Sequence, residues 1–270
     1  MNSPEAPSRT AAEARTTTRA PTASPQELRG ELRRVRAALA AAARAEGLRL
    51  CASGTPVLAD DSDTGTAGAD IGDHPRYRAG FLQYRRLLDE FVLCALHAHV
   101  HLLDRETTVL VSNHLRPWLP LLVAMSANSP YHRGRDTGYA GWRAVIRGCF
   151  PCLGPPPYAA SLDAYEHLAS AMAATEAMPE PGMPFWDVRP NPHTLTGHVL
   201  PSSAQAQRLV DHIRPALRAY GDEDDVTAFL HRLRQHGSAA ERQRARMAHE
   251  RHLSAVVDGL VRETCPDGCG

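Results

Sequence analysis

The chain has 270 residues, of which 43% are apolar, and its 30 basic and 30 acidic residues give a formal net charge of zero. This length allows one large domain or two small ones around a sizeable core. The balanced charge excludes a global field that would steer the protein to nucleic acid or to an acidic membrane surface. No stretch reaches the roughly 18 apolar residues of a membrane span. The N-terminus also lacks the apolar core of a secretory signal, so we expect a cytoplasmic protein.

The first quarter of the chain contains one strong helix signal. Residues 1–23 are rich in Ala, Thr, Pro, Ser and Arg, and they bury too little to offset their ordering entropy, which predicts disorder. Residues 24–27 form a capping box that begins an amphipathic helix, and Gly47 ends it. The sequence then predicts a short strand over 48–52 and a loop over 60–73.

A histidine-rich run follows a second predicted helix over about 75–91. Successive side chains of a strand point to opposite faces, so a strand over 93–103 would place His97, His99 and His101 on one face. Three imidazoles on one face can bind a divalent metal, contact a phosphate or line a cleft. The opposite face of this strand is apolar, and we expect it to be buried: Cys94, Leu96, Ala98, Val100 and Leu102.

The middle of the chain alternates helices with a long irregular stretch. Asp104 is predicted to cap a helix that runs to about Ala127, with a break near Trp118 because two nearby prolines remove backbone donors. Residues 128–160 show little periodicity, so we expect a long loop that is either functional or disordered.

The last part of the chain is predicted to be mainly helical. We expect a helix from Ser161 to about Ala177 and a strand over 185–189. Three amphipathic helices then follow, at about 203–219, 223–236 and 238–263. Strands separated by helices without regular βαβ repeats favour an α+β fold. Its expected organisation is a disordered tail over 1–23, a single domain over 24–264 with a helical part over 203–264, and a flexible tail over 265–270.

The six cysteines do not indicate a disulfide framework. Cys51 and Cys94 lie in apolar runs and are expected to be buried thiols. Cys149 and Cys152 have the spacing of a redox motif, but their flanks are those of a loop. We expect reduced, structural cysteines, with a zinc site between pairs of them as an open alternative.

Several stretches together resemble one protein family. The chain is similar to the bacterial glutamate–cysteine ligase type 2 group of ATP-dependent carboxylate–amine ligases, whose fold is similar to that of glutamine synthetase. The resemblance covers about residues 25–200 and 203–264. It implies an incomplete glutamine synthetase-like antiparallel sheet packed against helices. The matching stretches, in family order, are 47–56, 73–78, 96–100, 113–120, 126–131, 134–143, 154–157 and 186–190.

The resemblance implies a two-step reaction with ATP and Mg²⁺ as cofactors. ATP phosphorylates a carboxylate substrate, and an amine then attacks the acyl phosphate to form an amide. Magnesium ions draw negative charge from the transferring phosphoryl group, and arginines stabilise oxyanions. The implied partners are therefore a small carboxylate and an amine, and neither nucleic acid nor a membrane.

Matching positions assign metal and phosphate roles to the histidines. His97 corresponds to the family's metal-binding histidine, and His99 to the histidine that meets phosphate, with His101 beside it in place of a glycine. His198 falls where the family has a metal-binding glutamate, so it is the second candidate metal ligand.

The same matching assigns catalytic and substrate roles elsewhere. Arg143 and Arg189 are the candidate catalytic residues, and Asp136 and Thr137 are the candidate substrate-binding residues. Two structural alternatives stay open: Arg189 could instead pair with Asp187, and Asp136 could be a turn-forming residue.

The chain also departs from the family pattern. The N-terminal glutamate run whose carboxylates hold the metals has no counterpart, and a block is missing before Ser202. The remaining site is rich in histidine and arginine, which suits an anion better than magnesium. Missing strands leave unpaired sheet edges that a partner chain could cover, so we expect a homo- or hetero-oligomer.

Three functional interpretations remain open. The chain could be an active ligase with relocated metal ligands. It could be a non-catalytic relative that acts as a partner or regulator of a full-length ligase. It could also hold a transition metal through His97, His99 and His101 together with His198 or His193.

Overall fold

The computed structural model describes residues 24–58, 75–89, 91–177, 186–190, 195–197 and 203–265. The expectations for residues 1–23, for the loop over 60–73 and for the end of the chain after Cys265 lie outside these residues. The fold is α+β, as predicted, with many helices around small antiparallel sheets. The helices in chain order are α1 (Pro25–Ala45), α2 (Pro75–Tyr84), α3 (Arg86–Asp89), α4 (Arg105–Leu115), the 3-10 turn η1 (Arg116–Trp118), α5 (Leu119–Met125), α6 (Trp142–Gly148), α7 (Leu162–Ala173), α8 (Ser203–Tyr220), α9 (Glu223–His236), α10 (Ala239–Glu250) and α11 (Leu253–Thr264).

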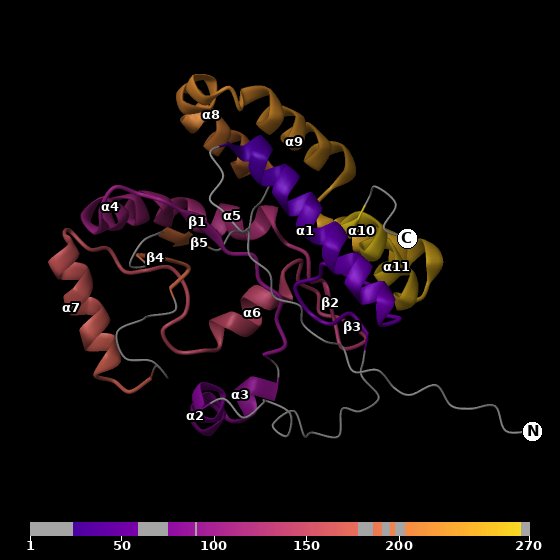
Figure 1. Ribbon diagram of the computed structural model, residues 1–270, viewed down its shortest axis with the longest axis horizontal. Helices are drawn as coiled ribbons and strands as arrows, with labels where there is room; N and C mark the ends of the chain where they lie inside the picture. The colour runs from indigo at the N-terminus through magenta and orange to yellow at the C-terminus, as the bar shows by residue number, and fades with distance from the viewer. Residues whose placement is uncertain are drawn as a thin grey trace, which may run out of the picture.

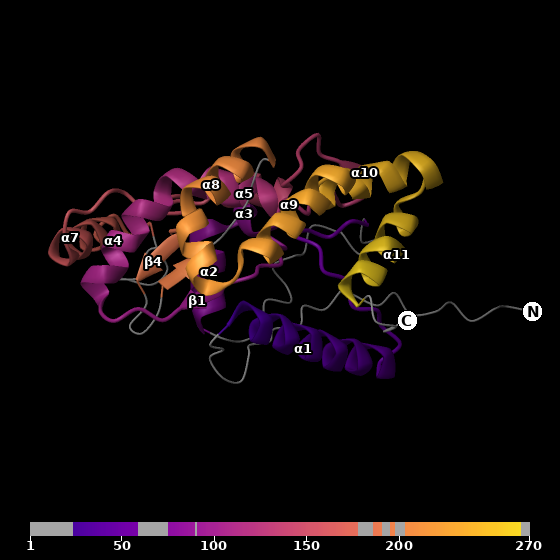
Figure 2. The ribbon, with the colours of Figure 1, turned by 90° about the horizontal axis from the view of Figure 1, so that it is seen from above.

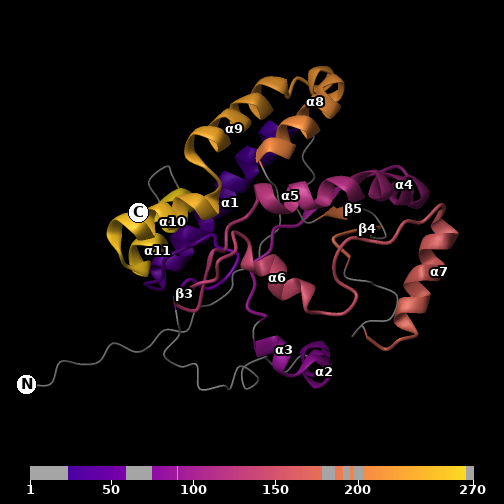
Figure 3. The same cartoon turned by 180° about the vertical axis from the view of Figure 1, so that it is seen from behind.

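Two separate antiparallel sheets are present in the described ranges. The first has three strands in the order β1 (Ala98–Val100), β5 (Leu195–Gly197) and β4 (Val188–Pro190). The second is a hairpin of β2 (Tyr131–His132) and β3 (Arg135–Asp136). Figures 1 and 3 show the three-stranded sheet beside α4, with α6 on its other side, while β3 lies toward α10 and α11.

Several helix boundaries follow from local capping, as the sequence predicts. The Ser24 hydroxyl accepts a hydrogen bond from the backbone N–H of Glu27 at 3.2 Å. Asp104 caps α4 by accepting from the N–H of Thr107 at 2.6 Å, and Ser161 caps α7 in the same way. The expected break near Trp118 is confirmed, because η1 separates α4 from α5.

Two predicted continuous helices are each divided in two. The helix expected over 75–91 divides into α2 and α3 at Arg85, whose φ of 45° is left-handed. The last predicted helix divides into α10 and α11 at Arg251, whose φ is 63°. His252 then caps α11, and the helical end of the chain contains four helices where we expected three. An αL residue ends a helix without needing glycine, and the sequence offers no clear sign of it.

Two expectations about irregular and extended segments are wrong. Residues 48–52 do not form a strand, because their backbone bonds elsewhere: the Ala52 carbonyl accepts from the Asn128 side chain and its N–H donates to the Thr264 hydroxyl. Residues 128–160 are not one long loop, since they contain the hairpin and α6. Elements of two to seven residues are too short to show periodicity.

The strand expected over 93–103 is reduced to β1, and its apolar face is not buried. Leu96 is 73% exposed and Val100 is 51% exposed, while Cys94 is also exposed. The reason is coverage: α4 packs mainly against β4. Val188 of β4 is only 1% exposed and packs against Leu119 of α5, against α4, and against Leu102 in the segment before α4.

The apolar core is divided into several clusters. Val109 of α4 packs with Tyr165 and Ala169 of α7 and with Trp186, which precedes β4. Other clusters join α5 to α8 and α9, and join the hairpin to α11. Figure 2 shows α1 along one side of the molecule, away from α8 and α4.

Two further observations bear on the composition. The described cysteines, Cys51, Cys94, Cys149, Cys152 and Cys265, are free thiols. Burial raises the pKa of Cys51 to about 11, so this thiol is protonated at neutral pH. Within the described residues, no helix has the length and apolar character needed to cross a membrane.

Candidate functional site

The face of the three-stranded sheet that points away from α4 carries polar residues. His99 of β1 and Arg189 of β4 are both paired in register with Thr196 of the central strand. Residues in one such row point to the same face, and so do residues two positions away along a strand. Val188 faces α4, so His99, Arg189 and Asp187 lie on the opposite face.

Helix α6 supplies two arginines to this face. Arg143 and Arg147 are four residues apart, so they lie on the same side of the helix. The Arg147 guanidinium donates to the Asp187 carboxylate at 2.5 Å, and both side chains are 11% exposed. This ion pair fixes α6 against β4. It also engages Asp187, the one carboxylate on this face among the described residues of β4 and those just before it.

Arg143 lies deeper than a surface arginine. Burial, followed by the positive charge of Arg147, lowers the pKa of Arg143 to about 10. The side chain is therefore still charged at neutral pH. Its Nε atom is buried and has no hydrogen-bond partner among the described residues. A buried charged donor without a partner is costly, and it indicates a group that an anion can complete.

His97 and His99 complete the cluster. Their ring centroids are 6.3 Å apart. The pKa of His97 is lowered by partial burial and by the positive charges of Arg189 and Arg143, among other neighbours. The imidazole is thus neutral at pH 7, because its surroundings oppose a further positive charge. We call His97, His99, Arg143, Arg147 and Arg189 the cationic face.

The position of Arg143 depends on a close backbone contact. The N–H of Arg143 donates to the hydroxyl of Ser129 at 3.1 Å, and Ser129 is 2% exposed. A Cβ on Gly54 would lie 3.2 Å from the Ser129 Cβ and 3.5 Å from the Arg143 Cδ. Gly54 therefore lets residues 53–55 approach the base of Arg143. Three stretches that carry the family resemblance meet at this point.

The donors of the cationic face do not fit a magnesium site. Mg²⁺ prefers several hard oxygen ligands, whereas this face offers imidazoles, guanidinium groups and one carboxylate that Arg147 already pairs. No group of three or more His, Cys, Asp or Glu that could hold a metal occurs in the parts of the chain that the structure describes. His193 and His198 lie outside those parts. On the described residues, an anion fits this face and Mg²⁺ does not.

Asp136 and Thr137 lie in another region, the β2–β3 hairpin and the turn after it. The Asp136 carboxylate accepts two hydrogen bonds from Arg244 of α10, at 2.7 and 3.1 Å, and one from the N–H of Gly138 at 2.9 Å. The Thr137 hydroxyl donates to the Pro130 carbonyl at 2.8 Å. Both side chains therefore stabilise the hairpin. The contacts of Asp136 agree with the alternative interpretation, in which it is a turn-forming residue.

The structure brings His97, His99, Arg143 and Arg189 together and leaves His101 aside. His101 follows the end of β1 and is exposed. Asp187, considered above as a partner for Arg189, accepts from Arg147 instead. Sequence reasoning missed Arg147, because residues 128–160 were expected to be a loop and a spacing of four residues from Arg143 is informative only on a helix.

Comparisons with known proteins show which family this chain is similar to. The model of the Glutamate-cysteine ligase family 2 (GCS2) matches residues 8–200. A relative from Saccharopolyspora erythraea, named "Putative glutamate--cysteine ligase 2-1", is 33% identical over 309 aligned residues, which take in 90% of this chain and 81% of the relative. A second protein from that organism, "Putative glutamate--cysteine ligase 2-2", is 43% identical over 63% of this chain and 42% of its own length. A "Putative glutamate--cysteine ligase 2-2" from Mycolicibacterium vanbaalenii is 30% identical over 89% of this chain and 83% of its own length.

The lengths of these alignments carry information about missing segments. An alignment of 309 residues is longer than this 270-residue chain, so it passes over positions of the relative that have no counterpart here. The agreement over most of the chain, together with the family match over residues 8–200, establishes descent. The chain belongs to the glutamate–cysteine ligase family 2.

Proposed function

We propose that this protein is a nucleotide- and carboxylate-binding member of the ATP-dependent carboxylate–amine ligases. The cationic face would hold the phosphate groups of ATP beside a small carboxylate substrate. The observation that carries the proposal is the partly buried Arg143 side chain, whose buried Nε has no partner among the described residues. Family membership supplies the class of ligand, since the relatives are named as ligases of glutamate and cysteine.

The free-energy cost of burying the positive charge of Arg143 supports an anionic ligand. A buried charge is destabilising unless another charge or several hydrogen bonds compensate it. Asp187, the nearby carboxylate, is already committed to Arg147. A phosphate or carboxylate oxygen can accept from the Nε of Arg143 and supply the missing compensation.

The width of the cationic face also suits a phosphate chain. His99 and Arg189 are two strands apart, which places their Cα atoms about 10 Å from one another. Both side chains extend from the same face, and the arginines of α6 approach from beside them. A polyphosphate or an acyl phosphate can therefore contact groups from β1, β4 and α6 at once.

In the reaction that the resemblance implies, these residues would act through charge. Arg143 and Arg189 would stabilise the oxyanions that develop during phosphoryl transfer to the carboxylate. The neutral imidazole of His97 can accept a hydrogen bond from a donor on the substrate. Arg147, held by Asp187, would position α6 and so Arg143.

A second function is favoured by the composition of the site. The described residues include no group of carboxylates that could hold Mg²⁺. The alignment with a relative also passes over positions that have no counterpart in this chain. A non-catalytic relative would keep the anion site without turnover, and it could regulate or pair with a full-length ligase. The exposed Val100 of β1 and the exposed Leu96 just before this strand offer an apolar surface for such a partner.

One experiment separates these functions. Calorimetric titration with ATP, with and without Mg²⁺, measures nucleotide binding, and a coupled assay measures ADP formation with glutamate and cysteine. Binding together with ADP formation that requires both amino acids supports the ligase. Binding without ADP formation, and with little effect of Mg²⁺, supports the non-catalytic relative. Failure to bind ATP, ADP or phosphate would overturn both.

A further inference from the structure

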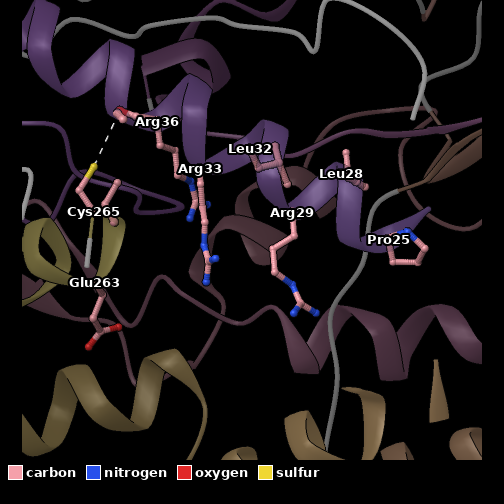
Figure 4. A pocket seen from close by; sticks show the side chains of 10 residues that line it. Pro25, Leu28, Arg29, Leu32, Arg33, Arg36, Glu263 and Cys265 are labelled. Atoms are coloured by element: carbon pink, nitrogen blue, oxygen red, sulfur yellow. Dashed lines mark hydrogen bonds between the residues drawn. The ribbon is translucent and has the colours of Figure 1, made fainter. Parts of the chain in front are cut away.

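A cavity of about 370 Å³ lies between α1 and the end of α11, and none of its lining residues belongs to the cationic face. Figure 4 shows the side chains of Arg29, Arg33 and Arg36 along one flank of this cavity, with Leu28 and Leu32 beside them and Glu263 across from them. The volume is at the lower end of the range for small-molecule sites.

The charges that line this cavity are unbalanced. Arg29, Arg33 and Arg36 recur every three or four residues, which places them on one side of α1. Arg29 pairs with Asp225 at 3.2 Å. Arg33 and Arg36 have no side-chain ion pair or hydrogen bond to any residue that the structure describes.

Glu263 does not neutralise these arginines. One of its oxygens accepts from Arg242 at 3.0 Å and the other from Arg246 at 3.2 Å, and both of these arginines belong to α10. The negative charge of Glu263 is therefore already shared by two cations. The α1 side of the cavity is left with an excess of positive charge.

The remaining lining of the cavity is apolar. Leu28 and Leu32 are one helical turn apart, so they face the same space next to the arginines. Helix α1 buries only Ala40 among its described side chains, and Leu28 is 40% exposed. A ligand in the cavity would thus cover apolar surface of α1 that the rest of the described chain leaves open.

We infer that this cavity binds a small anionic amphiphile, an acyl or alkyl chain that ends in a carboxylate or a phosphate. The anionic head would contact Arg33 and Arg36, and the apolar body would pack on Leu28 and Leu32. Charge complementarity selects an anion, while the leucines disfavour a fully hydrated ion such as inorganic phosphate alone. Binding would also fix α1 against α11.

The experiment uses octanoate and inorganic phosphate as probes of the full-length protein. Calorimetry should detect octanoate binding, with inorganic phosphate at least tenfold weaker. Arg33→Gln combined with Arg36→Gln should weaken octanoate binding by about tenfold or more, because the two charged donors for the head group are removed while Arg29 remains. Octyl phosphate and octanoate compared at equal chain length distinguish the two head groups.

Arg34→Gln is the matched control, since Arg34 is on the same helix, pairs with Glu31 and does not line the cavity. It removes one positive charge from the same helix and should leave octanoate affinity within twofold of the wild type. Hydrogen exchange adds a readout that needs no variant: octanoate should slow exchange in residues 25–45 and leave α6 unchanged. Equal weakening by Arg34→Gln, equal binding of phosphate and octanoate, or no protection of α1 would overturn the inference.

Discussion

The cationic face and the β2–β3 hairpin both carry arginine and aspartate, yet they use their charges differently. In the hairpin, Asp136 receives two hydrogen bonds from Arg244 and one from Gly138, so its charge is fully engaged. On the cationic face, Asp187 compensates Arg147, and the buried Nε of Arg143 is left without a partner among the described residues. Matched charges hold a fold together, whereas an unmatched buried charge indicates a ligand.

The largest expected effect tests the ion pair beside the cationic face. Asp187→Ala removes the carboxylate that pairs with Arg147 at a site where both side chains are 11% exposed. Breaking a buried pair costs about 3–5 kcal/mol of unfolding free energy. The Asp136–Arg244 pair is 47% and 33% exposed, so Asp136→Ala should cost less than about 1 kcal/mol.

Urea unfolding of the two alanine variants checks this difference. Removing Arg147 as well as Asp187 should recover part of the lost stability, because both charges of the pair are then absent. Equal losses for Asp187→Ala and Asp136→Ala would show that the two pairs do not differ in the way described.

A middle-sized effect is expected at the backbone contact below Arg143. In Gly54→Ala the new Cβ would lie 3.2 Å from the Cβ of Ser129, which is 2% exposed and cannot move away easily. Overpacking of this kind costs about 1–3 kcal/mol, and it should also weaken ATP binding by displacing Arg143.

Gly30→Ala is the matched control for this substitution. Gly30 lies in the interior of α1 and has nothing within 4 Å of its ideal Cβ position, so alanine should stabilise the helix by about 0.5–1 kcal/mol. Thermal unfolding and ATP titration of both variants give the comparison. If Gly54→Ala leaves both the stability and the ATP affinity unchanged, the close contact at Gly54 does not position Arg143.

The smallest expected effect is the contribution of the Asp136 carboxylate in the hairpin to the pH dependence of stability. The hydrogen bond from Arg244, and then that from Gly138, hold the pKa of Asp136 below its ordinary value, against the opposing effect of burial. A depressed carboxyl pKa stabilises the fold above the ordinary pKa of aspartate, and this contribution is lost as the pH falls through the lowered value.

Asp136→Asn should therefore be less stable than the wild type by under about 1 kcal/mol at pH 7. The difference should shrink as the pH falls below about 4, where the unfolded aspartate becomes protonated. Urea unfolding over this pH range measures it. A difference that grows toward acid would contradict the assignment of Asp136 to the hairpin.

Local signals account for the parts of the fold that sequence reasoning predicted. Ser24, Asp104 and Ser161 each cap a helix through a residue three positions away, and such contacts are visible in the sequence. Alternation along the strand likewise predicted that His97 and His99 share a face, and the family resemblance added Arg143 and Arg189 to the candidate site.

Long-range contacts account for what could not be predicted. Asp136 pairs with Arg244, which is 108 residues away, and Asp187 pairs with Arg147, which is 40 residues away. The exposure of Leu96 and Val100 depends on how far α4 reaches over the sheet. No periodic pattern contains this information, because it depends on which elements meet in space.

The most direct test of the cationic face is ATP titration of Arg143→Gln beside Arg244→Gln. Each substitution removes one arginine charge. Of these two arginines, only Arg143 has a buried nitrogen without a hydrogen-bond partner among the described residues. We predict that Arg143→Gln weakens ATP binding about 10- to 100-fold, consistent with about 1.5–3 kcal/mol for a hydrogen bond to a charged group, and does not lower the unfolding free energy. Arg244→Gln should bind ATP as the wild type does. Equal affinities for the wild type and Arg143→Gln would contradict the anion site on the cationic face.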